Sequence, residues 1–132
     1  MPALPKKDLM KNLSLSNGID IENPRRFERE HYSLNDPFFT KVFSKKELKY
    51  CFLRSDPSVH LAGKFACKEA VYKSLSQAGI HVSGISAIEV LNDSQNIPLI
   101  VCKELDLTKI RVAVSISHTA DLAIASAVVW SV

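Results

Sequence analysis

Two acidic residues and one lysine are the first candidates for chemistry. Glu69 and Lys73 lie four residues apart in a stretch, 60–79, that reads as one helix, so their side chains lie one turn apart on the same face. Asp20 lies far away in the sequence, between two isoleucines in a segment with strand periodicity. One interpretation is an exposed ion pair of ~0.2–0.5 kcal/mol and a strand aspartate that points to solvent. The other is that the acids are held for their charge.

A magnesium ion suits such a set of side chains. Mg²⁺ takes oxygen ligands, one or two of them from carboxylates, and completes its shell with waters and substrate phosphates. Together with Lys73, the ion would neutralise charge on a phosphoryl group during its transfer. The sequence has no Gly-rich phosphate loop, no His-Glu-x-x-His and no Cys/His zinc spacing. On residue types alone this is a weak signal, because every soluble protein contains two acids and a lysine.

The elements expected to position these residues begin with a strand and several helices. Residues 15–21 alternate between apolar and polar, which predicts a half-buried strand. Ser44 and Glu47 form a capping-box pattern, which predicts a helix to about residue 52. The 60–79 stretch predicts an amphipathic helix that ends at Gly79. Its expected core-facing stripe consists of Leu61, Phe65, Val71, Tyr72 and Leu75.

The last third of the chain is rich in expected strands. Residues 87–91 and 99–102 flank a run of turn-forming residues, which predicts a hairpin with a long loop. Residues 110–117 alternate as a strand with one buried face, and a turn follows at 118–121. The segment 122–130 is apolar on both faces, which favours a central or an interface strand. The expected fold class is therefore α+β, with antiparallel strands after the helices.

Size and composition limit the classes of protein to consider. The chain has 132 residues and a net charge of +3, which suits an acidic partner or a phosphate ligand but is too weak to indicate nucleic acid. We expect an arm at 1–14 and one domain at 15–132. Three widely spaced cysteines predict free thiols, and the absence of a signal peptide or membrane span favours a cytoplasmic protein with no membrane partner.

Five motifs, in order along the chain, resemble those of the holo-acyl-carrier-protein synthases, the short phosphopantetheinyl transferases. They cover about residues 18–130, nearly the whole chain past the arm. The motifs are Gly18-Ile19-Asp20-Ile21; Lys41-Val42-Phe43-Ser44 with Glu47-Leu48; Leu61-Ala62-Gly63-Lys64-Phe65-Ala66-Cys67-Lys68-Glu69-Ala70; Ile88-Glu89-Val90-Leu91-Asn92-Asp93; and Val114-Ser115-Ile116-Ser117-His118-Thr119.

The resemblance implies the phosphopantetheinyl transferase fold and a Mg²⁺-dependent reaction. The phosphopantetheine arm of coenzyme A would be transferred to a serine of an apo acyl carrier protein in fatty-acid synthesis, with release of adenosine 3',5'-bisphosphate. It also implies a homotrimer with active sites between neighbouring subunits. A different class of function is a non-catalytic module of the same fold that binds carrier proteins or nucleotides.

The resemblance also implies a role for each matching residue. Asp20 and Glu69 match the metal-binding acids, and Glu69 or a metal-bound water would accept the serine proton. Lys73 matches the lysine that steadies charge on the pyrophosphate. Two groups of further contacts are implied: coenzyme A would be held by Lys64, Lys73, Pro98, Ser117, His118 and Thr119, and the acidic carrier protein by Arg25 and Arg26.

Three positions depart from the family pattern. Lys64 stands where the family usually has arginine, which keeps the charge but not the bidentate geometry. Ser16 replaces the first glycine of the N-terminal motif. The hairpin turn reads Asn96-Ile97-Pro98, so only its proline matches. None of these changes removes an expected metal ligand.

Overall fold

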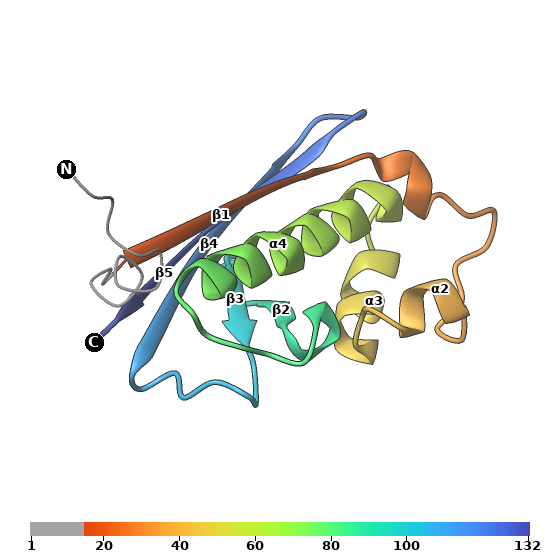
Figure 1. Cartoon of the computed structure of the whole chain (residues 1–132). Helices are drawn as coiled ribbons and strands as arrows, with labels where there is room; N and C mark the ends of the chain where they lie inside the picture. Colours follow the sequence, from red (N-terminus) through yellow and green to blue (C-terminus); the bar gives the residue numbers. More distant parts are fainter. Residues whose placement is uncertain (1–14) are drawn as a thin grey trace.

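The computed structural model describes residues 15–132 and consists of a long helix packed between two small antiparallel sheets. The predicted arm at 1–14 lies outside the described residues. The helix, α4 (Pro57–Gln77), runs along one face of a three-stranded sheet of order β1-β5-β4 (Figure 1). The strands of this sheet are β1 (Leu15–Glu22), β4 (Ile110–His118) and β5 (Ala123–Ser131), and the remaining elements are η1 (Pro24–Phe27), α2 (Pro37–Thr40), α3 (Lys45–Phe52), η2 (Ile85–Ala87), β2 (Glu89–Asn92) and β3 (Pro98–Val101).

This arrangement confirms the α+β class and most of the expected elements. The capping box forms in both directions, because Ser44 Oγ accepts from Glu47 N–H and Glu47 Oε1 accepts from Ser44 N–H. The hairpin forms as β2 and β3. The doubly apolar strand is β5, the central strand of its sheet. Gly79 follows the C-cap of α4 with φ +76°, and Ile80 N–H closes the end by donating to Leu75 C=O.

The prediction that α4 is amphipathic is wrong. The helix is buried on nearly all sides, because the three-stranded sheet covers one side while α3 and the β2–β3 hairpin cover another (Figure 1). Residues beside the expected stripe, such as Ala62, Ala66 and even Lys68, are therefore fully buried. Only the C-terminal part of the helix, around Lys73 and Gln77, has exposed side chains.

The strand β1 is confirmed, but its buried side is the polar one. Ser16 is buried against α4, where its hydroxyl donates to Ser74 C=O at 2.8 Å. Gly18 allows this close packing, since a Cβ added there would lie 2.0 Å from the carbonyl oxygen of Ala70. The alternate, apolar residues point away from the helix, so that Ile19 is 60% exposed.

A buried ion pair joins α3, α4 and the β2–β3 hairpin. Lys68 Nζ lies 2.8 Å from Glu47 Oε1, and both side chains are completely buried. Glu47 Oε2 accepts from Val90 N–H at 2.8 Å, and Lys68 donates to Ile88 C=O. Because three elements meet at this ion pair, the pair holds the β2–β3 hairpin against the two helices.

The three cysteines are free, as predicted, and the structure shows that all three are also buried. Burial raises the pKa of both Cys51 and Cys67 to about 12. None of the helices within residues 15–132 is long and apolar enough to cross a membrane.

Candidate active site

The strand carboxylate and the helix lysine meet where β1 crosses α4. Lys73 Nζ lies 3.0 Å from Asp20 Oδ1, and it also donates to Ile19 C=O at 3.1 Å. Asp20 can reach the helix because β1 turns its polar side inward. Glu69 lies one turn before Lys73 on the same face of α4. The structure therefore brings the three expected catalytic residues to one place.

The charge of Glu69 depends on its neighbours. Burial raises the pKa of Glu69, the Asp20 carboxylate raises it further, and Lys73 acts in the opposite direction. Glu22, on the same side of β1, also raises this pKa, whereas Arg26 lowers it. The acids thus repel each other across the gap between strand and helix, and a cation between them would relieve that repulsion.

The donor set of this cluster fits a magnesium ion. Both candidate ligands, Asp20 and Glu69, offer carboxylate oxygens, which are the hard donors that Mg²⁺ requires. Among residues 15–132, no three histidine, cysteine or acidic side chains are grouped to hold a metal ion. A Mg²⁺ ion here would therefore need waters and substrate phosphates to complete its shell, as the ion does in phosphoryl-transfer sites of known mechanism.

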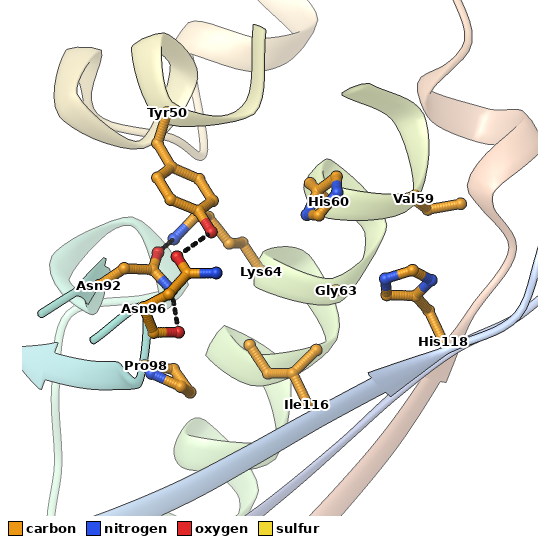
Figure 2. Close-up of a pocket in the computed structure, with 10 residues that line it drawn as sticks. All are labelled: Tyr50, Val59, His60, Gly63, Lys64, Asn92, Asn96, Pro98, Ile116 and His118. Carbon is orange, nitrogen blue, oxygen red and sulfur yellow. Dashed lines mark hydrogen bonds between the residues drawn. The ribbon is translucent and has the colours of Figure 1, made fainter. Parts of the chain in front are cut away.

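A separate pocket of about 160 Å³ lies near the N-terminal half of α4. Figure 2 shows that its lining side chains come from α3, α4, the β2–β3 hairpin and the end of β4. Three of the expected coenzyme A contacts, Lys64, Pro98 and His118, line it. These three residues, which are far apart in the sequence, therefore lie around one pocket.

Most of the hydrogen-bond donors of Lys64 are used by contacts with the β2–β3 hairpin, which forms one wall of this pocket. Lys64 is only 3% exposed, and its Nζ donates to Val90 C=O at 2.6 Å. The same Nζ donates to Asn92 Oδ1 at 2.7 Å (Figure 2). Burial lowers the pKa of Lys64. Because two of its three N–H donors are used, at most one is left to contact a phosphate. Lys64 thus has a structural role, and the predicted phosphate contact would have to use its remaining donor.

The other two residues of the C-terminal motif do not line the pocket. Ser117 alternates with His118 along β4, so it lies on the opposite, outer face of the sheet. Thr119 holds the following turn: its Oγ1 accepts from Asp121 N–H at 3.2 Å and from Leu122 N–H at 3.1 Å. Within one chain, the expected coenzyme A contacts are therefore not all on one surface.

Sequence reasoning missed the contributions of Tyr50, His60 and Asn92 to this pocket. Tyr50 donates to Asn96 Oδ1 at 2.6 Å, and Asn92 accepts the bond from Lys64. His60 lies one turn before Lys64 on α4, and this spacing of four residues was a signal that could have identified it. The contacts of Tyr50 and Asn92 connect distant parts of the chain, which no local pattern reveals.

The expected docking residues lie on η1. Arg25 and Arg26 are exposed, and the Arg26 guanidinium forms an ion pair with Glu22. Arg26 also borders a cavity of about 490 Å³ whose apolar walls include Phe27 and Phe65. Lys41 is a second cation at this cavity. This part of the surface therefore combines positive charge with apolar area.

Asp20, Glu69 and Lys73, here called the acid cluster, lie on the opposite side of α4 from the pocket. Glu69 and His60 are nine residues apart, about two and a half helical turns, so they point in opposite directions. Asp20 is on one edge strand of the three-stranded sheet and His118 is on the other, with β5 between them. On one chain, the two groups of residues therefore face different sides of the helix and the sheet.

The chain resembles known proteins over most of its length. Residues 16–127 match the family model of the 4'-phosphopantetheinyl transferase superfamily. The holo-[acyl-carrier-protein] synthase of Chlorobaculum parvum is 37% identical over 112 residues, which cover 85% of this chain and 95% of the relative. That of Protochlamydia amoebophila is 38% identical over 125 residues, 90% of this chain and 99% of the relative.

Solved structures show the same fold. The ACPS–CoA complex of Chronobacterium ammoniagenes superposes with a TM-score of 0.73 at 28% identity, covering 91% of this chain and 99% of that one. The holo-[acyl-carrier-protein] synthase of Helicobacter pylori, in complex with coenzyme A, gives a TM-score of 0.67 at 33% identity and covers 88% and 99%.

Proposed function

The chain belongs to the 4'-phosphopantetheinyl transferase superfamily, and from this premise we propose that it transfers phosphopantetheine from coenzyme A to a serine of an apo acyl carrier protein. Its relatives are named holo-[acyl-carrier-protein] synthases, and related structures contain coenzyme A. One observation carries the proposal most directly: Asp20, Glu69 and Lys73 converge from β1 and α4. The products are the holo carrier protein and adenosine 3',5'-bisphosphate.

The acid cluster supplies the groups that this reaction needs. Asp20 and Glu69 would hold Mg²⁺, which supplies positive charge to the diphosphate when bound. Lys73 is held in place by Asp20, and its ammonium would neutralise charge that builds up on the leaving phosphate. The carrier protein brings the serine nucleophile, so the chain needs no catalytic serine or cysteine of its own.

We propose that this chain is a homotrimer whose active sites form between subunits. The acid cluster and the pocket face opposite ways, so one coenzyme A can use both only if they come from different chains. The outer face of the three-stranded sheet provides a surface for a second copy, because its exposed side chains are largely apolar. They include Leu15, Ile19, Ile21, Ile124 and Trp130.

Placing a charge on this sheet face is expected to separate the subunits. Ile19→Asp would put a carboxylate at the apolar surface, where an unpaired charge buried between subunits costs several kcal/mol. We expect a smaller particle by light scattering or ultracentrifugation and a loss of transfer activity of about a hundredfold or more. Leu53→Asp makes the same change at an exposed leucine at the end of α3, and it should leave size and activity unchanged. A wild-type chain that sediments as a monomer would contradict the proposed trimer.

The proposed reaction is tested by mass. Apo acyl carrier protein is incubated with coenzyme A, Mg²⁺ and the protein, and the intact carrier is then weighed. We expect a gain of one phosphopantetheine group, and none when coenzyme A is left out. An unchanged carrier that nevertheless binds the protein would show a non-catalytic binding module instead.

Charge reversal at η1 is expected to weaken carrier docking. Arg26→Glu should raise KM for the carrier protein about tenfold, because an acidic partner would meet a negative charge at the contact. Arg25→Glu should act in the same direction, and it breaks no ion pair within residues 15–132. Lys103→Glu, an equal change of charge at an exposed lysine elsewhere, should leave KM near the wild-type value. An effect mainly on KM for coenzyme A would remove Arg26 from the docking surface.

We place the reaction in the cytoplasm and in fatty-acid synthesis. The three free cysteines agree with a reducing compartment, in which thiols stay unpaired. The relatives are named for acyl carrier protein, the carrier of growing acyl chains.

A further inference from the structure

His60 lines the same pocket as Lys64 and His118. Its imidazole ring lies with its centroid 5.4 Å from that of His118 and 6.3 Å from the ring of Tyr50. Figure 2 shows His60 on α4 and His118 at the end of β4, with both rings near Gly63. Two imidazoles therefore border the same small space as Lys64.

The charged groups around His60 are mostly cationic. Burial lowers the pKa of His60, and His118 lowers it further. The groups that act on it from α3, α4, β4 and the α3–α4 connection are Arg54 and Lys64, which also lower its pKa, and Asp56, which raises it. Without a ligand, His60 is thus neutral near pH 7. A bound anion would reverse this balance by stabilising the imidazolium form.

The chemistry of coenzyme A indicates which anionic group would bind beside His60. The molecule has a diphosphate, which the proposed reaction places at Asp20, Glu69 and Lys73, and one other phosphate, the 3'-monoester. At about 160 Å³, the pocket is smaller than the ~300 Å³ at which whole-ligand sites begin, so it suits one end of a ligand. A phosphate monoester has a charge near −2 at pH 7 and three acceptor oxygens for the nearby N–H groups.

We propose that His60 is a further contact for the 3'-phosphate of coenzyme A, and that it binds this group in its protonated form together with His118. The inference rests on the proposed function and deepens it, because it adds a residue that selects coenzyme A over its dephosphorylated form. Binding then takes up a proton at His60. The contribution of His60 to affinity is therefore largest at low pH and is lost as the pH rises towards 8.

The 3'-phosphate of coenzyme A also titrates in this pH range. The experiment must separate this effect from proton uptake at His60. The second pKa of the phosphate is near 6, so protonation of the ligand weakens binding at low pH. This effect is the same for every variant, whereas proton uptake at position 60 requires the histidine. The useful quantity is thus the ratio of dissociation constants between a variant and the wild type at each pH.

The test measures coenzyme A binding by isothermal titration calorimetry, with Mg²⁺ present, between about pH 6 and pH 8. His60→Phe keeps an aromatic ring, and His60→Gln keeps a neutral donor. We expect both to weaken binding about tenfold at the acidic end, the effect of losing one charge-assisted hydrogen bond, and less than about twofold at the basic end. With dephospho-coenzyme A, the variants should match the wild type at every pH. His31→Phe, at an exposed histidine outside the pocket, should change nothing.

Three results would overturn this proposal. An equal loss of affinity at all pH values would assign His60 a packing role, and an equal loss for dephospho-coenzyme A would separate it from the 3'-phosphate. Wild-type affinity in both variants would mean that His60 makes no contact. Failure of the proposed function looks different, since the wild-type protein would then bind no coenzyme A and modify no carrier protein.

Discussion

Replacing Glu69 with glutamine is expected to lower kcat for phosphopantetheine transfer about a hundredfold or more and to leave the protein folded. Glutamine keeps the shape of the side chain but removes the charge, so a cation at the cluster would lose one of its two carboxylates. The remaining activity should need a higher Mg²⁺ concentration. Steady-state rates measured over a Mg²⁺ series, with the melting temperature of each variant, check both statements.

The comparison for this variant is Glu104→Gln. Glu104 is exposed and accepts from Ser83, a contact that an amide oxygen can still make. We expect the rate and the Mg²⁺ requirement of this variant to match the wild type. Near-normal turnover in Glu69→Gln would instead reassign Glu69 to a structural role and remove the basis for the metal site.

The second large effect is expected at the buried ion pair of α3 and α4. Lys68→Met should lower the free energy of unfolding by about 3–5 kcal/mol, because it leaves the Glu47 carboxylate buried without its cation. It also removes the bond to Ile88 C=O that holds the hairpin. Urea denaturation followed by circular dichroism, at equal protein concentrations, measures the change.

Two further variants separate loss of charge balance from loss of packing. Glu47→Gln with Lys68→Met removes both charges, so it should be less destabilising than Lys68→Met alone. Lys45→Met changes an exposed lysine on α3 and should shift the free energy of unfolding by less than about 0.5 kcal/mol. A loss below 1 kcal/mol in Lys68→Met would show that water reaches the pair.

Local patterns predicted most of the elements. The capping box at Ser44 and the glycine after α4 are decided by hydrogen bonds within a few residues, so the sequence alone reveals them. The same is true of the alternation in β4. Motif order along the chain identified Asp20, Glu69 and Lys73, although no spacing rule connects a strand residue with a helix residue some fifty positions later.

The burial of α4 and β1 could not be predicted in the same way. Hydrophobic periodicity assumes that apolar side chains face the core of their own chain. In β1 the residues that pack inward are Ser16 and Gly18, because the strand lies so close to α4 that only small side chains fit. Ile19 faces away from the helix. An apolar side turned outward has a physical reason if another subunit covers it, and a single sequence does not contain that information.

The pocket was predicted only in part for a related reason. Lys64, Pro98 and His118 were grouped through the family resemblance, whereas Tyr50 and Asn92 join them through contacts between distant elements. Lys64 also has a structural role, because its hydrogen bonds to Val90 and Asn92 hold the β2–β3 hairpin in place. A motif reveals which residues recur together, but not how their donors are divided.

The buried cysteines have a practical consequence. Because only thiolates react readily with maleimides or iodoacetamide, Cys51 and Cys67, with a pKa of about 12, should stay unmodified at neutral pH in the native protein. Cys102 is buried as well. A single cysteine engineered at an exposed position such as Leu53 would then be the one thiol that reacts, so a fluorophore could be attached to the native protein at that position alone.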